Sequence, residues 1–331
     1  MKAIVWTRYG PPEGLQLAEV ARPTPKDNEV LVRVHATTVT AGDCELRSLK
    51  FSIWLRVFFR IYMGLTKPRR KILGQELAGD VEEIGKDVKR FKKGDQVFGT
   101  TGFGFGAYAE FDCVPVESQT AVLATKPANM TYEEAAAVPM GGLEALRFLR
   151  RGNLQRGQRI LINGAGGSIG TVAVQLAKYF GAEVTAVDRT EKLDMLRSIG
   201  ADRVIDYTRE EFTEGCETYD AILDVVGKGS ISHGLRVLKG DGRFLVANPR
   251  LSSMLRGLTS SKRGGKKVIF RAPNPTTEDL VFLKELIEAG RIRSVIDRRY
   301  PLEQVPEAHR YVESGHTRGK VIISVEQNDI T

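Results

Sequence analysis

The clearest hydrophobic pattern in the chain lies between residues 159 and 188. Residues 160–162 form a short apolar run typical of a buried strand, and residues 183–187 are expected to form a second strand. Between them, apolar residues recur at helical spacing until Gly181 ends the repeat. These residues are Val172, Ala173, Leu176, Ala177 and Phe180. The pattern predicts a strand, a turn, a helix and a second strand in immediate succession.

The turn in this unit is rich in glycine. It consists of Gly164, Ala165, Gly166, Gly167, Ser168, Ile169 and Gly170. A side chain in such a turn would keep the backbone away from a pyrophosphate, whereas free N–H groups and the positive end of the following helix attract its charge. Asp188 ends the second strand, 24 residues after Gly164, where a carboxylate can accept both hydroxyls of an adenosine ribose. Together these features predict a dinucleotide-binding unit.

The remaining pattern divides the chain into two domains. Residues 1–126 alternate short β-rich runs with proline and glycine turns, which predicts a mostly β, barrel-like domain. Residues 127–272 alternate strands and helices, as in a doubly wound parallel sheet of the Rossmann type. A helix is expected near residues 277–289, and residues 320–325 are expected to rejoin the first sheet as a strand. We therefore predict an α/β chain whose Rossmann domain is inserted into a β domain formed by residues 1–126 and 273–331.

Composition and charge are those of a soluble globular protein. Of the 331 residues, 42% are hydrophobic and 27% are charged, and the formal net charge is +8. Basic residues concentrate in residues 67–71 (KPRRK) and in residues 250–267, of which 250–265 are the expected mobile loop. Such clusters can meet nucleic acid, an anionic membrane or a phosphorylated ligand. A solvated surface explains them better, and nucleic-acid binding is not expected.

Cysteine usage predicts a reduced, cytoplasmic setting, because Cys44, Cys113 and Cys216 are far apart and form no CxxC pair. The N-terminus lacks the apolar core of a signal peptide, so none is expected. The most apolar segment, residues 51–65, is interrupted by two arginines and is shorter than the roughly 20 residues that a spanning helix requires. It is therefore not expected to cross a bilayer.

Several motifs, taken in order, resemble one family. They are Gly74-Gln75-Glu76 with Gly79, Lys93-Gly94-Asp95-Gln96-Val97, AAAVPMGG at residues 135–142, NGAGGSIG at residues 163–170, IGADRVIDY at residues 199–207 and RGKVIISV at residues 318–325. Together they resemble the medium-chain dehydrogenase/reductases, and among these the zinc-free quinone-oxidoreductase-like branch. The resemblance covers almost the whole chain. It implies a GroES-like β domain formed by both chain ends, an inserted Rossmann domain, a cofactor in the cleft between them, and a homodimer.

Zinc ligands are not expected. Zinc-dependent members of the family hold the metal with a cysteine, a His-Glu pair and a second cysteine, because Zn²⁺ prefers thiolate and imidazole donors. Cys44 lies close to the first position, but Gln75 stands where the histidine would be, and the second cysteine is missing. The structural-zinc loop is missing too, since residues 99–113 contain one cysteine. The histidines lack ligand spacing and are predicted to be surface or packing residues; they are His35, His233, His309 and His316.

The resemblance points to Thr40 and Asp43 as the catalytic candidates near the nicotinamide and the substrate. Asp43 matches the family pattern, Thr40 replaces an asparagine, and Glu45 stands where a tyrosine is often found. For Asp43, capping of a short helix is an equally supported role.

The resemblance also implies cofactor contacts beyond the glycine-rich turn. Lys192 and Tyr207 match positions that approach the adenosine 2′-phosphate in NADPH-using relatives. The charge of Asp188 opposes that phosphate and Arg189 can offset the repulsion, so NADH is slightly favoured over NADPH. For Lys192, an ordinary exposed helix lysine is an equally supported interpretation.

The remaining cofactor candidates lie near predicted strand ends. Val226, Val246 and Asn248 follow or end strands of the Rossmann sheet and are expected to border the nicotinamide, although Asn248 also suits a plain turn. Lys320 is expected near the cofactor, with a strand-edge charge as the alternative.

Residues 51–65 permit three interpretations. Their aromatic and apolar side chains can wall an acceptor pocket or lid, can form an amphipathic helix packed on the core, or can attach to a membrane surface with help from KPRRK. The first two are favoured equally, and peripheral membrane contact is the weaker alternative.

These observations lead to one predicted function and one rival. Without a Lewis acid, hydride removal from a simple alcohol is difficult, whereas hydride from a nicotinamide adds readily to a quinone or an enone. We predict a zinc-independent, NAD(P)H-dependent reductase that acts on a small apolar carbonyl or quinone substrate, the acceptor being a quinone or an activated alkene. The rival is a catalytically inactive nucleotide-sensing or RNA-binding Rossmann protein, which Thr40, Glu45 and the basic loop motivate.

Overall fold

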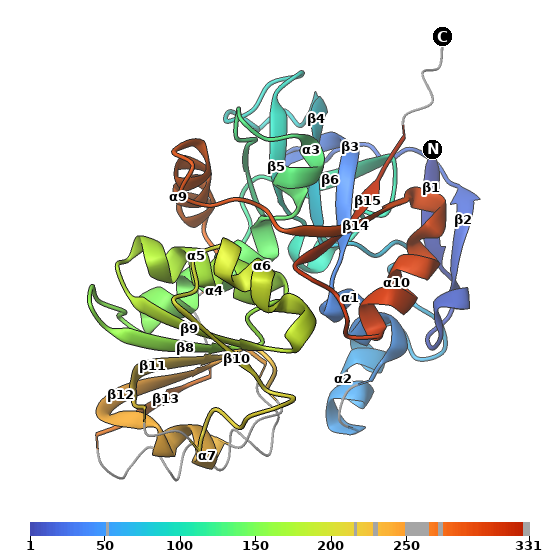
Figure 1. Ribbon diagram of the computed structural model, residues 1–331. Helices are drawn as coiled ribbons and strands as arrows, with labels where there is room; N and C mark the ends of the chain where they lie inside the picture. The colour runs from blue at the N-terminus through green and yellow to red at the C-terminus, as the bar shows by residue number, and fades with distance from the viewer. Residues whose placement is uncertain (51–52, 215–216, 228–230, 249–264, 271–273, 327–331) are drawn as a thin grey trace. The chain divides into compact units, whose positions relative to one another are not determined.

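The computed structural model describes residues 1–50, 53–214, 217–227, 231–248, 265–270 and 274–326, without the side chains of residues 53–55 (Figure 1). Most of the predicted mobile loop, residues 250–265, and Cys216 lie outside these ranges. The described chain forms two compact units. Unit 1 comprises Met1–Met140, Pro275–Glu288 and Ser294–Thr331, and unit 2 comprises Gly141–Asn274 and Ala289–Arg293. The predicted domain boundaries at residues 126 and 273 stay predictions.

Unit 1 is built on a seven-stranded sheet with the order β14-β15-β3-β4-β5-β7, and β6 also pairs with β3. Its strands are β3 (Glu29–Val39), β4 (Glu76–Ile84), β5 (Gln96–Thr100), β6 (Phe111–Pro115), β7 (Val122–Thr125), β14 (Ile296–Pro301) and β15 (Lys320–Ser324). A separate hairpin pairs β1 (Lys2–Trp6) with β2 (Leu15–Glu19). β15 runs antiparallel to β3, with Val321 opposite Val39. The expectation that the end of the chain rejoins the first sheet is confirmed.

Alternating apolar side chains explain why this sheet has a buried face. Val30, Val32 and Val34 of β3 pack in one core with Leu77 of β4 and Val321 of β15. The β-branched side chains suit a pleated surface, and their burial is the main favourable term in forming it.

The helices of unit 1 are short. They are α1 (Ala41–Ser48), α2 (Ile53–Met63), α3 (Tyr132–Ala136), α9 (Thr277–Glu288) and α10 (Val305–Glu313), with 3₁₀ turns η1 (Pro12–Gly14), η2 (Gly102–Gly104) and η4 (Leu302–Gln304). At α3, Thr131 and Glu134 form a capping box. In the described ranges, no helix is both long enough and apolar enough to pass through a bilayer.

Unit 2 contains a six-stranded parallel sheet with the order β10-β9-β8-β11-β12-β13. The strands are β8 (Arg159–Asn163), β9 (Glu183–Asp188), β10 (Arg203–Asp206), β11 (Tyr219–Asp224), β12 (Leu238–Val246) and β13 (Lys267–Ile269). The helices are α4 (Pro139–Arg151), whose first two residues belong to unit 1, α5 (Ser168–Tyr179), α6 (Leu193–Ser198) and α7 (Ile231–Arg236), with 3₁₀ turn η3 (Thr190–Lys192). Figure 1 shows α4, α5 and α6 on one face of this sheet and α7 on the other. The predicted doubly wound parallel sheet is confirmed.

One buried ion pair ties the end of the chain to the sheet of unit 1. Lys320 Nζ of β15 contacts Glu76 Oε2 of β4, and both side chains are almost completely buried. Thr38 Oγ1 donates to the same carboxylate oxygen, and Met140 N donates to Glu76 Oε1 at 2.7 Å. A buried carboxylate is tolerated only when it is paired and hydrogen-bonded, and Glu76 meets both conditions.

We expect Lys320→Met to lower the free energy of unfolding by about 4 kcal/mol, because it leaves the Glu76 carboxylate buried without its cation. Glu76→Gln combined with Lys320→Met should recover most of this loss, because it removes both charges and keeps acceptors for Met140 N. Urea unfolding of the two variants checks this. Equal destabilisation in both would show that shape, not charge, sets the stability here.

Candidate functional site

The glycine-rich turn joins β8 to α5 and is fixed to the neighbouring strand. The N–H groups of Gly164 and Ala165 both donate to Val187 O of β9, at 3.0 and 3.1 Å. Gly164 has φ +81°, a left-handed conformation that favours glycine. Gly167 is the N-cap of α5. The first N–H groups of a helix have no partner within the helix, so the turn ends on donors suited to an anion.

Space around the turn distinguishes its glycines. A Cβ on Gly170 would lie 2.4 Å from Gly164 O, and a Cβ on Gly166 would lie 2.4 Å from Lys192 Cδ. A Cβ on Gly167 would meet nothing closer than 3.7 Å. Gly170 is therefore required by the backbone of the turn itself and Gly166 by the side chains packed over it, whereas Gly167 leaves an open approach to the backbone.

Asp188 and Lys192 form a nearly buried pair beside this turn. Asp188 Oδ2 accepts from Gly166 N at 2.8 Å, while Oδ1 accepts from Arg189 N at 2.9 Å and pairs with Lys192 Nζ at 3.3 Å. Lys192 is 7% exposed, so it is not the ordinary exposed lysine that the sequence allowed as an alternative. Both oxygens of the predicted ribose acceptor are already engaged by protein donors.

Arg189 and Tyr207 flank this pair in different ways. The Arg189 side chain lies 3.8 Å from Glu191 Oε2, so its charge is shared with that carboxylate. Tyr207 N donates to Asp188 O at 3.2 Å, and the Tyr207 side chain is about half exposed. The backbone thus places Tyr207 at the end of β10, next to Asp188.

The ends of β11 and β12 supply the other predicted cofactor residues. Val226 is partly exposed, and its Cγ2 would lie 2.7 Å from a Cβ on Gly164, so it covers the start of the glycine-rich turn. Asn248 Nδ2 donates to Val225 O at 2.8 Å, which is a turn-stabilising contact. Val246 packs in the core of unit 2, so its side chain does not face an open surface.

Asp224 stabilises the turn that follows β11 by accepting hydrogen bonds from its backbone. Its Oδ1 accepts from Asn163 Nδ2, Val226 N and Gly227 N at 3.0 to 3.2 Å. Burial raises the pKa of the Asp224 carboxyl, although these donors oppose the shift. The C-terminal ends of β8, β9 and β11 therefore meet at one edge of the parallel sheet, where ligands of such sheets bind.

The two catalytic candidates lie in unit 1 and form a capping box at the start of α1. Thr40 Oγ1 accepts from Asp43 N at 3.1 Å, and Asp43 Oδ2 accepts from Thr40 N at 2.9 Å. The capping role that the sequence allowed for Asp43 is therefore present. Asp43 is fully buried, and burial, opposed by the hydrogen bonds from Thr40, raises the pKa of its carboxyl to about 6.

Tyr108 is a neighbour of Asp43 that the sequence did not reveal. Its ring is fully buried, and a Cβ on Gly74 would lie 2.6 Å from its Cδ1. Within the described residues, Tyr108 Oη and Asp43 Oδ1 have no hydrogen-bond partner of good geometry, yet burial first and then the Asp43 charge hold the pKa of the phenol well above its usual range. Periodicity gives no signal for such a pair, because its members come from distant segments.

A second buried group in unit 1 places a neutral thiol and a neutral imidazole beside the Arg47 guanidinium. Cys44 Sγ lies 3.3 Å from His309 Nδ1, which also accepts from Arg47 Nε at 3.3 Å. Burial raises the pKa of the Cys44 thiol, and burial together with the Arg47 charge lowers the pKa of His309 to about 3. His309 is a packing residue, as predicted. Across the part of the chain that the structure describes, no three histidine, cysteine, aspartate or glutamate side chains cluster closely enough to hold a metal.

Lys320, the last predicted cofactor contact, also belongs to unit 1. Its ammonium is bound to Glu76 and its side chain is 3% exposed, so the strand-edge alternative does not describe it. Its contact with a cofactor stays a prediction.

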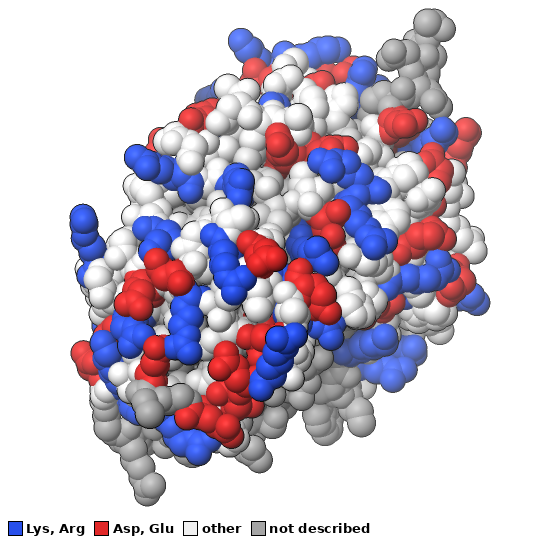
Figure 2. Space-filling model, viewed as in Figure 1, with Lys and Arg blue, Asp and Glu red and all other residues white. Residues whose placement is uncertain are grey.

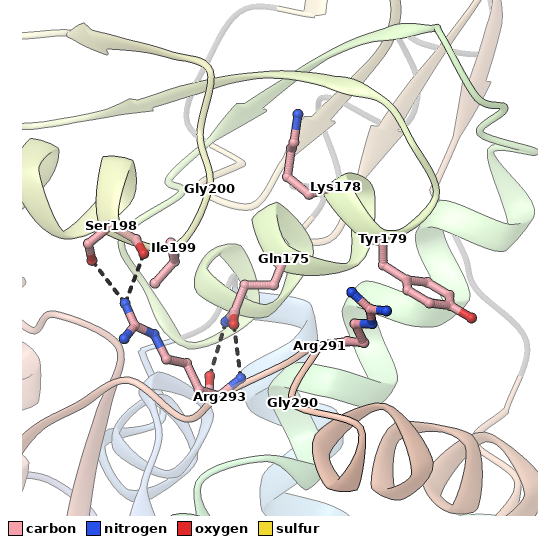
Figure 3. A pocket seen from close by; sticks show the side chains of 9 residues that line it. All are labelled: Gln175, Lys178, Tyr179, Ser198, Ile199, Gly200, Gly290, Arg291 and Arg293. Carbon is pink, nitrogen blue, oxygen red and sulfur yellow. Dashed lines mark hydrogen bonds between the residues drawn. The ribbon is translucent and has the colours of Figure 1, made fainter.

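A pocket of about 620 Å³ lies elsewhere in unit 2 (Figure 3). Gln175 fixes its floor by exchanging two hydrogen bonds with the backbone of Arg293, and Arg293 in turn donates to Ser198. The pocket includes Tyr179 at the end of α5, about 15 Å along the helix axis from the glycine-rich turn at its start. It is therefore distinct from the proposed nucleotide-binding edge.

Comparison with known proteins agrees with this arrangement. A family described as "Alcohol dehydrogenase GroES-like domain" matches residues 26–125, and one described as "Zinc-binding dehydrogenase" matches residues 199–323. The chain is 31% identical to the 2-methylene-furan-3-one reductase of Solanum lycopersicum, over 98% of this chain and 79% of that protein. It is 34% identical to the mitochondrial NAD(P)H oxidoreductase RTN4IP1 of Mus musculus, over 90% of this chain and 82% of that protein.

A solved structure shows the same architecture. The quinone oxidoreductase from Coxiella burnetii superposes with a TM-score of 0.86 at 28% identity, covering 98% of this chain and 99% of that one. Fold and sequence together define an oxidoreductase with a nicotinamide-cofactor domain. The chain belongs to the medium-chain dehydrogenase/reductase superfamily, in its quinone-oxidoreductase-like branch.

Two glycine variants separate the folding role of the turn from its binding role. Gly170→Ala should destabilise the protein by about 2 kcal/mol, because its Cβ meets backbone atoms. Gly167→Ala should change stability by less than about 0.5 kcal/mol and still weaken nucleotide binding about ten-fold, because its methyl group occupies the open approach. Thermal unfolding and fluorescence titration with NADH and NADPH check both. Unchanged nucleotide affinity in Gly167→Ala would contradict the assignment.

Proposed function

We propose that this oxidoreductase transfers hydride from NAD(P)H to a quinone or to the β-carbon of an enone or enal, without zinc. The observation that carries the proposal is the open backbone at Gly167, on the helix N-terminus of a parallel-sheet edge. The similar tomato protein is named for an acceptor in which a methylene group is conjugated to a ketone, and the similar Coxiella protein is named as a quinone oxidoreductase. Both acceptors are electron-poor, so one hydride chemistry serves them.

The chain's own residues support the zinc-independent part of the proposal. Gln75 is an amide where a zinc-dependent relative would need an imidazole, and its Nε2 donates to Gly102 O at 3.2 Å. The neighbouring Glu76 is committed to Lys320 and Met140. Neither side chain is set up as a metal ligand.

The glycine-rich turn and the start of α5 are proposed to hold the pyrophosphate of the cofactor. A bound nicotinamide supplies the hydride. Asp188 carries the predicted slight preference for NADH, since its charge repels a 2′-phosphate. Its pairing with Lys192 reduces that repulsion, so we propose that the preference is smaller than ten-fold.

Asp43 is proposed as the group that holds a proton for the reduced acceptor. Below a pH of about 6 its carboxyl is protonated, because burial raises its pKa. Tyr108 keeps its phenolic proton throughout the working pH range, since its pKa is raised well above the usual value. The pair therefore offers one exchangeable and one permanent proton beside Thr40. A homodimer and a cytoplasmic location stay predictions.

Nucleotide binding and turnover test the proposed function directly. NADH and NADPH should both bind in a fluorescence titration, and 1,4-benzoquinone, 9,10-phenanthrenequinone or an enone should be reduced. Lys192→Met should weaken the binding of NADPH at least three-fold more than the binding of NADH, because it leaves the Asp188 charge uncompensated. Binding without reduction of any acceptor would instead support a nucleotide-sensing protein.

The pH dependence of catalysis tests Asp43. We expect kcat/KM to fall as the pH rises through about 6, because the protonated carboxyl is lost there. Asp43→Asn should remove this inflection while keeping the acceptor oxygen that caps α1. As a control, Asp112→Asn changes another buried carboxyl of the same unit and should leave the inflection in place. An inflection that persists in Asp43→Asn would show that another group titrates.

A further inference from the structure

Helix α2 carries apolar side chains on two sides. On the inner side, Met63 is 1% exposed and Phe59 packs against the core of unit 1. On the outer side, and just beyond the helix end, the apolar side chains keep between 50% and 64% of their surface in solvent. They are Val57, Phe58, Ile61, Tyr62 and Leu65. The inner residues account for the packing of the helix, so the outer ones need another explanation.

The helix is held in a defined position. Tyr9 OH donates to Gly64 O at 2.8 Å, and Arg69 N donates to Met63 O at 2.6 Å. The Arg60 guanidinium lies 5.5 Å from the centre of the Tyr9 ring. The outer apolar side is therefore presented by a fixed element of unit 1.

Charge along α2 and the segment that follows it has one sign. No acidic residue occurs in the sequence between Glu45 and Glu76. Five exposed basic residues lie on α2 and in the segment that follows it: Arg56, Lys67, Arg69, Arg70 and Lys71. Over most of the face shown in Figure 2, basic and acidic side chains are interspersed instead. An exposed apolar helix side next to a purely basic segment is complementary to a surface that has anionic groups on the outside and an apolar layer directly below them.

We propose that α2 and residues 64–71 form a docking surface for an anionic phospholipid membrane. The outer apolar side chains enter the boundary between headgroups and acyl chains, and the basic side chains contact the lipid phosphates and carboxylates. A second copy of the chain fits this surface less well, because a two-fold interface would bring the same basic segment against itself. The contact is peripheral. It depends both on the burial of the apolar side chains and on the attraction between the basic side chains and the anionic lipids.

Vesicle sedimentation with the full chain tests the proposal. The wild type should bind vesicles of phosphatidylcholine and phosphatidylserine at 70:30 and should not bind pure phosphatidylcholine vesicles. Arg56→Glu combined with Lys67→Glu should weaken binding about 25-fold or more, because each basic residue near an anionic surface contributes about five-fold. Phe58→Ser combined with Ile61→Ser should weaken it at least ten-fold at unchanged charge.

A matched control separates this surface from net charge. Lys89→Glu combined with Lys92→Glu makes the same charge change on the β4–β5 connection, which Figure 1 shows at the opposite end of unit 1 from α2. It should change vesicle binding less than two-fold. The thermal midpoint of every variant should stay within 3 °C of the wild type, which shows that the variants fold.

Three results would overturn the proposal. If the protein bound neutral vesicles as tightly as anionic ones, the basic residues would have no role in binding. If the control variant lost as much vesicle binding as the charge-reversal variant of α2 and residues 64–71, this surface would have no specific role. A shift from dimer to monomer in Phe58→Ser/Ile61→Ser would assign α2 to an interface between copies. A rise in KM for the acceptor in that variant, with vesicle binding intact, would assign it to a lid over the substrate.

Discussion

One buried carboxylate connects four segments of the first unit. Glu76 in β4 receives hydrogen bonds from Thr38 in β3 and from Met140 at the start of α4, and it pairs with Lys320 in β15. Because a charge away from water is tolerated only with such partners, these segments cannot part without exposing or stranding it. The carboxylate therefore joins the end of the chain to a sheet in which five of the seven strands come from the first 125 residues.

The second unit depends on a different constraint, the close approach of backbone to backbone. Gly164, Gly166 and Gly170 let β8 turn into α5 within a space that side chains would fill. Asp188 then holds the turn from the neighbouring strand through Gly166 N, and Lys192 balances its charge. The same contacts that stabilise the turn also set the charge that an approaching cofactor meets, so binding and folding share residues here.

The surface of the first unit shows how one helix can serve two environments. Phe59 and Met63 stabilise α2 by packing against the core, while Phe58, Ile61 and Tyr62 remain in solvent. The free energy gained by hydrophobic burial is proportional to the apolar area removed from water. The outer side of α2 therefore contributes no such free energy until a membrane or another surface covers it. The basic residues in the segment after α2 favour a covering surface that is anionic.

The sequence by itself determined the elements and their order. Local periodicity, glycine at required backbone positions and the acid at the end of β9 were enough to predict the strand, turn, helix and strand of residues 159–188, because these features act over a few residues. The doubly wound sheet and the return of β15 followed from the alternation of strands and helices and from the β character of residues 320–325. The helix expected near residues 277–289 is α9, which ends one residue earlier, at Glu288.

Only the tertiary structure decided which side chains meet. Lys320 pairs with Glu76 across 244 positions, and Tyr108 lies beside Asp43, although neither pair leaves a periodic trace. Lys192 turned out to be buried against Asp188, although the two residues are only four positions apart and the sequence pattern also allowed an exposed lysine. Contacts between distant segments depend on how sheets and helices assemble, and that assembly is what a local pattern does not contain.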